Sequence, residues 1–538
     1  MTLYINGKLY VDKDTFATSM VVKDDRIIKV GTEEECRRVF KGSEIIDLKG
    51  KTVIPGFNDS HLHFLMTAEY LDMLPITDVT SMKELIQRGI SYIEEKTLTE
   101  DDILYTEGWN HTQFTDEKRI PTKHDLDKIS TEVPIVMVRV DRHVASLNTA
   151  ALAYFNISNE TELEVGGEIE KDEANQLTGV LKEGAVDLVR SQLPVKTADE
   201  KKDSLIRTMK LANSMGITSM HTNDAKDESI METLALYEAL DAENQLTIRF
   251  YQQIWFNNGK YMPDFLSSHY RFQQGSKWNK IGPVKLFIDG TLGSRTAAMR
   301  SGYSDDPENT GILTKSQETL NKEVAMAVEY DYQVIIHGIG DKGIETILNA
   351  YDAALGDREN TLRLGVNHMQ ITGMDLINRV ADKGYLTYVQ PIFIDDDLPI
   401  IVERIGEERA RTSYLFKTMK DKGIHQSFSS DAPIVSFNPF ENIQCAITRN
   451  RLTTPHETPY LPEEAMDVAS AIDAYTYESA YASFDENEKG RLKAGYFADF
   501  IVLDEDIFTC SPQRIKDIDV LATVAGGKVV YKKEQDNV

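Results

Sequence analysis

A repeated pattern of helix, glycine and short apolar strand constrains the fold of this chain more than any other feature. An amphipathic stretch ends at Gly216, at Gly384 and at Gly423, and an apolar run follows each glycine directly. Glycine just beyond a helix accepts the left-handed backbone that ends it, and a strand that follows at once is typical of a βα unit. We count eight candidate parallel strands, near residues 52–57, 216–221, 246–253, 283–289, 333–337, 363–368, 385–390 and 424–430. Eight such units predict an α/β fold, a (β/α)8 barrel of the TIM type.

The two ends of the chain follow a different pattern. Residues 1–55 and 490–538 contain short strand-like runs, with hairpin signals at Asn6-Gly7, Asp24-Asp25 and Gly526-Gly527. Neither piece has enough apolar surface to fold alone, because isolated hairpins are marginally stable. We therefore expect the two ends to pair into one composite β-sandwich beside the barrel.

A long segment interrupts the barrel pattern after its first strand. Residues 65–195 separate this strand, 56–64, from the remainder of the barrel, 196–489, by far more than one crossover needs. The segment has strands of its own and a helix that opens with a capping pattern at Ser81. We interpret it as an inserted α/β domain that forms a lid.

The charge of the chain excludes some classes of partner. Lys and Arg total 59 against 87 Asp and Glu, a net charge of −28. This charge repels the phosphate backbone of nucleic acids and anionic membrane surfaces, so we expect neither as a partner. No apolar run approaches the ~18–20 residues that span a bilayer, and the start of the chain lacks the pattern of a secretory signal. Three scattered cysteines are too few for a disulfide framework or a thiolate zinc site, and we expect a cytoplasmic protein.

Candidate metal ligands lie at the predicted strands. His61 and His63 are two residues apart, so both imidazoles point to one face of an extended strand. Later strands add four candidates, which are Lys285, His337, His368 and Asp431. Because the carboxyl ends of barrel strands converge on one site, we expect these side chains to meet. The alternatives are a solvated His-x-His pair, a barrel lysine paired with an acid, and Asp431 as a helix N-cap.

These residues lie in the segments VIPGFNDSHLHF, KLFIDGTLGSRTA, HGIGDKG and SSDAPIV, and GYFADFIVLD follows near the end of the chain. In this order the motifs resemble the metal-dependent amidohydrolase superfamily, and they are similar to the branch that includes N-substituted formamide deformylase. The resemblance covers essentially the whole chain. It implies a set of metal ligands in which His61 and His63 hold one metal, His337 and His368 hold a second, Lys285 bridges them as a carbamate, and Asp431 ligates the first. One departure is Asn367-His368-Met369, where the family more often has Glu-His-Ala. This departure affects a residue that contacts the ligand His368, and not the ligand itself.

A physical argument supports a carbamate at Lys285. A lysine with its ordinary pKa of ~10.4 would place a cation beside a divalent metal. Metal favours the neutral amine, which can capture carbon dioxide and become an anionic bridge. Imidazole ligands favour one or two Zn²⁺ ions, and Mn²⁺ or Fe²⁺ also suits these nitrogens.

The resemblance also implies contacts to a substrate. In the resembling branch the insert folds over the metal mouth, where His143 would steady a developing oxyanion and Trp109 would form an apolar wall. A satisfied histidine and a core tryptophan are the alternatives. His221, at the tip of the second barrel strand, contacts either the substrate or only the outer side of a ligand. Arg295, in GTLGSRTA, suits a substrate carboxylate.

We therefore predict a hydrolase that cleaves a non-peptide C–N bond of a small molecule, an amide or an N-substituted formamide, with a metal-activated water. Asp431 would act as base and then as acid. Hydrolysis of cyclic amides and deamination remain alternatives, because both use the same ligands. A binding protein without catalysis is a further alternative, although such a protein should have lost part of the ligand set. Barrels of this kind often pair, so a homodimer stays open.

Overall fold

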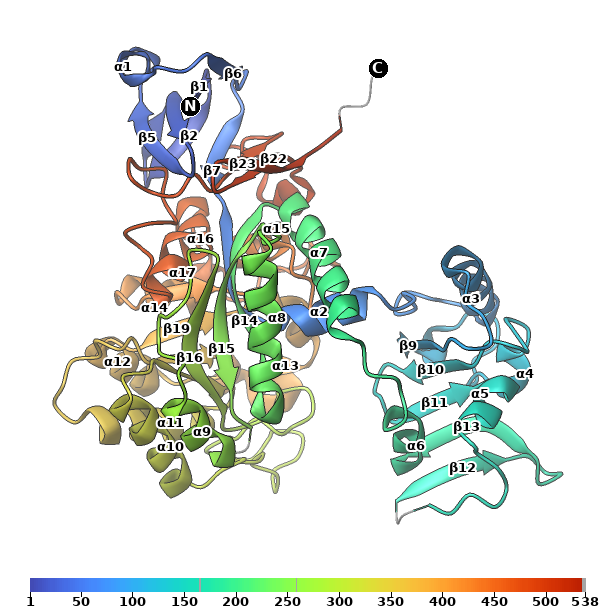
Figure 1. Cartoon of the computed structure of the whole chain (residues 1–538). Helices are drawn as coiled ribbons and strands as arrows, with labels where there is room; N and C mark the ends of the chain where they lie inside the picture. The colour runs from blue at the N-terminus through green and yellow to red at the C-terminus, as the bar shows by residue number, and fades with distance from the viewer. Residues whose placement is uncertain (164–165, 258, 535–538) are drawn as a thin grey trace. The chain divides into compact units, whose positions relative to one another are not determined.

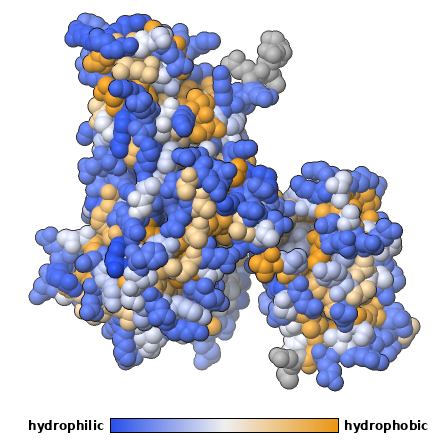
Figure 2. Space-filling model, in the orientation of Figure 1, coloured by the Kyte–Doolittle hydropathy of each residue, from blue (hydrophilic) through white to orange (hydrophobic). Residues whose placement is uncertain are grey.

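The computed structural model describes residues 1–163, 166–257 and 259–534 (Figure 1). The chain divides into two compact units. The barrel unit comprises Met1–Thr67 and Leu205–Val538, and the inserted unit comprises Ala68–Ser204, where the sequence predicts an insert over 65–195. Hydrophilic side chains cover most of the surface of both units that Figure 2 shows, as expected for a chain with 27% charged residues. Within the described ranges, no helix has the length and apolar character needed to cross a bilayer.

Eight parallel strands form the centre of the barrel unit. In spatial order they are β8 (Phe57–Leu62), β14 (Ile217–Lys226), β15 (Arg249–Trp255), β16 (Asn279–Phe287), β17 (Val334–Gly338), β18 (Gly365–His368), β19 (Leu386–Val389) and β20 (Gln426–Phe428). Hydrogen bonds also join the first strand to the end of the last. Ser60 Oγ donates to Phe428 O at 2.9 Å, and Asp431 N donates to His61 O at 2.9 Å. The sheet therefore closes on itself, and the predicted (β/α)8 barrel is confirmed.

Helices follow the barrel strands, as the sequence pattern predicts (Figure 1). They are α2 (Phe64–Leu71), α7 (Ala198–Ser214), α8 (Ile230–Ala242), α9 (Met262–Ser267), α10 (Gln317–Glu329), α11 (Asp341–Leu355), α12 (Met374–Lys383), α13 (Phe393–Ala410), α14 (Phe416–Asp421), α15 (Pro439–Thr448), α16 (Val468–Ala474) and α17 (Tyr477–Ala482). Gly384 ends α12 in the left-handed conformation, with φ 64°, so the glycine signal in the sequence had the expected cause.

The first barrel strand begins later than the predicted range 52–57. Residues Thr52–Pro55 form β7, which pairs with β2 and β21 outside the barrel. Pro55 has no N–H with which to extend that ladder, and the chain leaves it at Gly56. A Cβ atom on Gly56 would lie 2.2 Å from Thr218 Oγ1, so only glycine fits where the chain enters the barrel.

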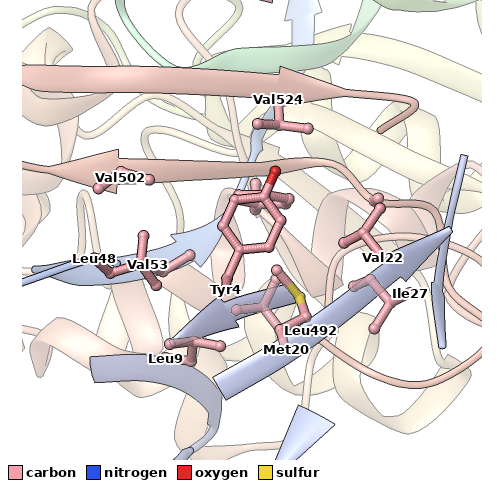
Figure 3. Close-up of a cluster of buried hydrophobic side chains, with 12 residues drawn as sticks. Tyr4, Leu9, Met20, Val22, Ile27, Leu48, Val53, Leu492, Val502 and Val524 are labelled. Atoms are coloured by element: carbon pink, nitrogen blue, oxygen red, sulfur yellow. The ribbon is translucent and has the colours of Figure 1, made fainter. Parts of the chain in front are cut away.

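The two ends of the chain form a composite sandwich of two sheets. One sheet has the order β5-β4-β1-β6 and the other the order β23-β22-β21-β7-β2-β3. Their elements are β1 (Thr2–Ile5), β2 (Lys8–Asp12), β3 (Thr15–Ala17), β4 (Ser19–Lys23), β5 (Arg26–Gly31), α1 (Glu33–Val39), β6 (Glu44–Asp47), β21 (Phe500–Leu503), β22 (Val520–Ala525) and β23 (Lys528–Lys532). Apolar side chains from both ends meet between the sheets, among them Tyr4, Val53 and Val502 (Figure 3). The expected pairing of the two ends is confirmed.

One of the three predicted hairpins is wrong. β4 pairs with β5 across Asp24-Asp25, and β22 pairs with β23 across Gly526-Gly527, both antiparallel. At Asn6-Gly7, however, β1 pairs with β4 and β6 while β2 pairs with β3 and β7. Asn6 has φ 54°, so the local turn conformation is present, but it carries the chain from one sheet to the other.

The inserted unit is built on a sheet of order β12-β13-β11-β10-β9. Its elements are α3 (Met82–Lys96), β9 (Leu104–Trp109), α4 (Lys123–Leu126), β10 (Ile135–Arg139), β11 (Val144–Leu147), α5 (Thr149–Tyr154), β12 (Gly167–Lys171), β13 (Leu177–Glu183) and α6 (Asp187–Arg190). The side chain of Ser81 accepts a hydrogen bond from Glu84 N and caps α3, as the sequence predicts. The unit has apolar clusters of its own, which include Leu85 with Ile135 and Val138 with Leu181.

Candidate active site

The barrel brings the six predicted side chains of the metal site together. β8 carries His61, His63 follows directly after the strand, and all six residues are buried. His61 Nε2 lies 3.2 Å and His63 Nε2 lies 3.6 Å from Asp431 Oδ1. Asp431 reaches this place because its backbone N–H bonds to His61 O, which fixes the end of β20 beside β8.

The two later histidines join the same cluster. The ring centroids of His337 and His368 are 4.4 Å apart, and those of His61 and His368 are 6.1 Å apart. Lys285 on β16 is completely buried beneath them. His368 and Asp431 adopt φ values of 75° and 62°, which residues with a Cβ atom rarely occupy. Such backbone strain concentrates at functional sites, where the surrounding structure holds it in place.

One ring nitrogen of each histidine contacts a carbonyl oxygen. The contacts are His61 Nδ1 with Gln253 Oε1 at 2.6 Å, His63 Nδ1 with Asn223 O at 3.0 Å, His337 Nε2 with Gly290 O at 3.2 Å, and His368 Nδ1 with Gln390 Oε1 at 2.8 Å. A carbonyl oxygen accepts only, so the nitrogen facing it must donate, and the other nitrogen of each ring keeps its lone pair. This is the arrangement that orients metal-binding imidazoles.

Burial keeps the site in the protonation state that metal binding needs. Burial lowers the pKa of His63 to about 4 and that of His337 to about 3, and it lowers the pKa values of His61 and His368 well below the ordinary value. The charge of Lys285 adds to the lowering at all four rings. All four imidazoles are therefore neutral at pH 7. With Asp431 they form a set of nitrogen and oxygen donors that fits divalent metal ions.

Lys285 forms no close ion pair with any described residue. Burial lowers the pKa of its ammonium group, and burial raises the pKa of the Asp431 carboxyl. The Nζ atom lies 3.5 Å from Leu286 O and 3.8 Å from the centroid of the Phe287 ring, and no carboxylate of the described residues forms an ion pair with it. The nearby acid is Asp431, whose charge raises the pKa of Lys285 against the effect of burial, so the alternative of a barrel lysine paired with an acid stays open.

The histidines lie at the floor of a cavity of about 460 Å³ within the barrel unit. Its walls are mainly apolar, with the aromatic rings of Trp255, Phe287 and Phe393. Phe393 stacks on His368, with ring centroids 5.8 Å apart. The volume and the apolar lining are those of a site for a small organic molecule.

The comparison of the sequence with known families agrees with this geometry. The profile of the amidohydrolase family matches residues 44–531. The chain belongs to the amidohydrolase family. It is therefore an enzyme, as the sequence predicts.

Known amidohydrolases resemble this one along nearly its whole length. Putative amidohydrolase YtcJ of Bacillus subtilis is 32% identical over 96% of each chain. N-substituted formamide deformylase of Arthrobacter pascens is 26% identical over 99% of this chain and 98% of that protein. Among solved structures, an uncharacterized metal-dependent hydrolase from Pyrococcus furiosus has a TM-score of 0.77 at 28% identity, and the match covers 94% of this chain and 100% of that one.

The amidohydrolase places the four predicted substrate contacts in different surroundings. Trp109 has no exposed surface and packs in the core of the inserted unit, which favours the core alternative. His143 is exposed, and its Nδ1 lies 2.8 Å from Glu183 Oε2. His221 is fully buried against Tyr251 and is not part of the cavity wall. Their roles in substrate binding stay predictions.

Arg295, the fourth predicted contact, is already paired. Its Nε and Nη2 donate to the two carboxylate oxygens of Asp305 at 3.1 Å and 2.7 Å. It does not line the cavity, although its neighbours Thr291, Leu292 and Gly293 do. The guanidinium group would have to leave Asp305 before it could bind a substrate carboxylate.

Sequence reasoning missed most of the cavity wall of the amidohydrolase. The residues it missed are Trp255, Phe287, Gln370, Phe393, Asp396 and Asp397. It also missed Asp59, whose Oδ1 accepts hydrogen bonds from His61 N and Ser430 N and so braces both metal-binding segments. The run of three aspartates at 395–397, soon after β19 ends at Val389, was an available signal, because that end of every strand faces the site.

Asn367, the residue before His368, differs from the pattern of the resembling family, and its side chain contacts the ring of His368. Asn367 is buried, and its Nδ2 lies 2.9 Å from His368 Nε2. This is the ring nitrogen that does not contact Gln390. Metal ligation through it would replace the hydrogen bond from Asn367.

Proposed function

We propose that this amidohydrolase is a metal-dependent enzyme that hydrolyses the C–N bond of a small amide or N-substituted formamide. The observation that carries the proposal is the group of four neutral imidazoles and Asp431 at the floor of an apolar cavity. Its similarity to a formamide deformylase over nearly the whole chain supports the choice of bond.

The residues present would hold one or two metal ions. His61, His63 and Asp431 offer ligand atoms within 4.8 Å of one another and would hold the first, and His337 and His368 would hold the second. Zn²⁺ is favoured by the imidazoles, and Mn²⁺ or Fe²⁺ suits the same atoms. When bound, such an ion polarises the carbonyl and lowers the pKa of water from ~15.7 to about 7.

Lys285 would carry the carbamate. Burial lowers the pKa of the ammonium group, so the neutral amine is accessible near pH 7. The amine adds to carbon dioxide, forms the N–C bond of the carbamate and releases one proton. The anion would then replace a buried cation that has no close ion pair among the described residues, which supports this modification.

Asp431 would move the proton. Burial raises the pKa of its carboxyl, so the group is a stronger base than an exposed aspartate. It would take the proton of the attacking water and pass it to the leaving nitrogen. The apolar walls keep other water molecules away during this transfer.

A substrate panel tests the reaction. Protein from metal-supplemented growth should release amine from formamides or acyl amides faster than it hydrolyses cyclic ureas or deaminates heterocycles. Turnover of a cyclic amide or an aminated heterocycle alone would overturn the proposal in favour of those reactions. The small-molecule substrate, the cytoplasmic location and the homodimer remain predictions.

A further inference from the structure

The cavity carries negative charge and no positive charge on its walls. Besides Asp431, its lining includes Asp396 and Asp397, and no lysine or arginine lines it in the described part of the chain. Asp396 is exposed to the cavity, and Asp397 is partly buried. The part of the wall formed by Asp396 and Asp397 therefore favours a cationic group over an anionic one.

Helix α13 carries the carboxylates of Asp396 and Asp397, which line the cavity at a distance from the histidines. Phe393, in its first turn, stacks on His368. Asp396 and Asp397 follow three and four residues later, so they lie on the same helix face, ~4.5–6 Å further along the axis at 1.5 Å per residue.

The neighbouring Asp395 has a different role, which shows that the acidic run is not one uniform patch. Pro399 has no N–H for the Asp395 carbonyl, which accepts from Arg451 Nε at 2.8 Å instead. Asp395 Oδ1 accepts from Leu452 N at 2.7 Å. Asp395 therefore fixes the helix to the loop that follows α15, and of the three aspartates only Asp396 and Asp397 line the cavity.

Gln370 supplies an independent sign of a ligand. It lines the cavity and is 3% exposed, and its Nε2 donates to Asp397 Oδ2 at 2.5 Å. This bond fixes the orientation of the amide, because a carboxylate accepts only. Gln370 Oε1 is then left buried without a hydrogen-bond partner among the described residues. A buried acceptor without a donor is unfavourable unless a ligand completes it.

The carboxylates also have unused acceptor atoms. Tyr414 donates to the same Oδ2 of Asp397, so its Oδ1 accepts no hydrogen bond from any described side chain or backbone group. Asp396 likewise has no hydrogen bond or ion pair within the described ranges. Burial raises the pKa of Asp397 to about 6 and raises that of Asp396, with Arg451 only partly opposing the rise at Asp396. Neither carboxylate forms an ion pair with a described residue that would offset this cost.

The Trp255 end of the cavity, beside His63, offers a hydrogen-bond donor instead of acceptors. Trp255 Nε1 is a buried donor without a partner among the described residues, and its ring lies 5.6 Å from that of His63. A substrate carbonyl suits this end, and N–H donors suit the end formed by α13. We propose that the substrate carries a primary ammonium group, held by Asp396, Asp397 and Gln370, on an apolar body whose amide faces the histidines.

A purely structural role for the aspartates of α13 explains only part of this arrangement. Acidic residues are common in the first turn of a helix, where they complement its free N–H groups. That reading accounts for aspartates in α13. It does not account for the partnerless oxygen of Gln370 on a different segment, nor for the absence of lysine and arginine from the cavity wall in the described ranges.

Matched substrates test the inference, which rests on the proposed function for the reaction itself. N-formyl-4-(aminomethyl)benzylamine and N-formyl-4-ethylbenzylamine have nearly the same shape and differ in the ammonium group. We expect kcat/KM to favour the ammonium substrate about tenfold, the effect of one hydrogen bond to a charged group. Asp396→Asn should remove most of this preference, and Glu408→Gln, which removes an exposed charge elsewhere on α13, should keep it. Equal kcat/KM values in the wild type, or an unchanged preference in Asp396→Asn, would overturn the inference.

A binding measurement separates this inference from the proposed reaction. Calorimetry on the metal-loaded protein compares benzylammonium with benzyl alcohol, which needs no turnover. Tighter binding of benzylammonium in the wild type, lost in Asp396→Asn, supports the ammonium site even if no formamide is hydrolysed. Equal affinities, or the same preference in Asp396→Asn, contradict it even if formamides are good substrates. Any amine that ligates the metal directly would do so equally in both proteins.

Discussion

Two tryptophans show how the two units of this amidohydrolase use the same residue differently. Trp109 in the inserted unit has no exposed surface, and its Nε1 donates to Met137 O at 2.8 Å. Trp255 in the barrel unit lines the cavity, and its Nε1 has no partner among the described residues. The residue type alone does not separate the two tryptophans. The difference teaches that an unsatisfied polar atom on a cavity wall marks a site better than residue type does.

Two aspartates show the same contrast between a side chain that is paired within the protein and one that is not. Burial raises the pKa of Asp125 in the inserted unit, but hydrogen bonds from Arg119 and Thr122 outweigh burial and hold the pKa well below its ordinary value. Asp397 in the cavity receives hydrogen bonds from Tyr414 and Gln370 but has no cation, and its pKa rises to about 6. The inserted unit neutralises its buried charge internally, whereas the cavity leaves its charge for a ligand.

The largest expected effect is on catalysis in the cavity of the barrel unit. Asp431→Asn should lower kcat by ~10²–10⁴-fold, because it removes the proposed proton carrier. The melting temperature of the metal-free protein should stay the same or rise, because burial already disfavours the charged carboxylate. Steady-state kinetics and thermal unfolding measure both. Near-normal turnover in this variant would remove Asp431 from the mechanism.

Exchange of each tryptophan for alanine gives the next largest effect. Trp109→Ala should destabilise the protein by ~3–5 kcal/mol, because it empties a fully buried site. Trp255→Ala should cost clearly less stability and should lower kcat/KM about tenfold through the lost apolar wall. Denaturant unfolding and kinetics on both variants give the comparison. An equal loss of stability in the two proteins would show that Trp255 is a core residue as well.

Asp125→Asn tests whether the inserted unit depends on its internal charge pair. We expect a loss of about 1–3 kcal/mol at pH 7, from a weaker bond to Arg119 and a weaker helix cap at Thr122. A lowered pKa contributes stability above the unfolded value of ~3.9 and loses it as the pH falls through the folded value. The difference between wild type and variant should therefore shrink in acid. A difference that is constant from pH 7 to pH 3 would contradict this reading.

Asp397→Asn should increase the stability of the protein at pH 7, in contrast to Asp125→Asn, and its effect should be the smallest of those predicted. A pKa raised to about 6 means that the native state holds a proton which the unfolded state has lost, so stability falls as the pH rises from about 4 to 6. The variant should be more stable than the wild type by about 1–2 kcal/mol at pH 7 and equal to it near pH 4. Chemical unfolding at both pH values measures this. Lower stability of the variant at pH 7 would show that Asp397 already has its partner within the protein.

The sequence predicts this fold well because its signals are local. A glycine at the end of a helix and an apolar run after it identify a βα unit, and strand ends share one edge, so His61, His337 and Asp431 could be placed together. Asn6-Gly7 misled because strand pairing depends on partners far along the chain. The cavity wall escaped prediction for a similar reason. The direction of α13 and the free oxygen of Gln370 depend on contacts with Asp397 and Tyr414 that no local pattern contains.

The metal content of the purified protein tests the metal centre most directly. After growth with added zinc, elemental analysis should find at least about one equivalent in the wild type, because four neutral imidazoles and a carboxylate bind divalent ions strongly. A His61→Asn, His63→Asn double variant that unfolds at the same temperature as metal-free wild type should hold less than about half as much. Less than about half an equivalent in the wild type, or the same content in both proteins, would contradict a metal centre at this end of the barrel.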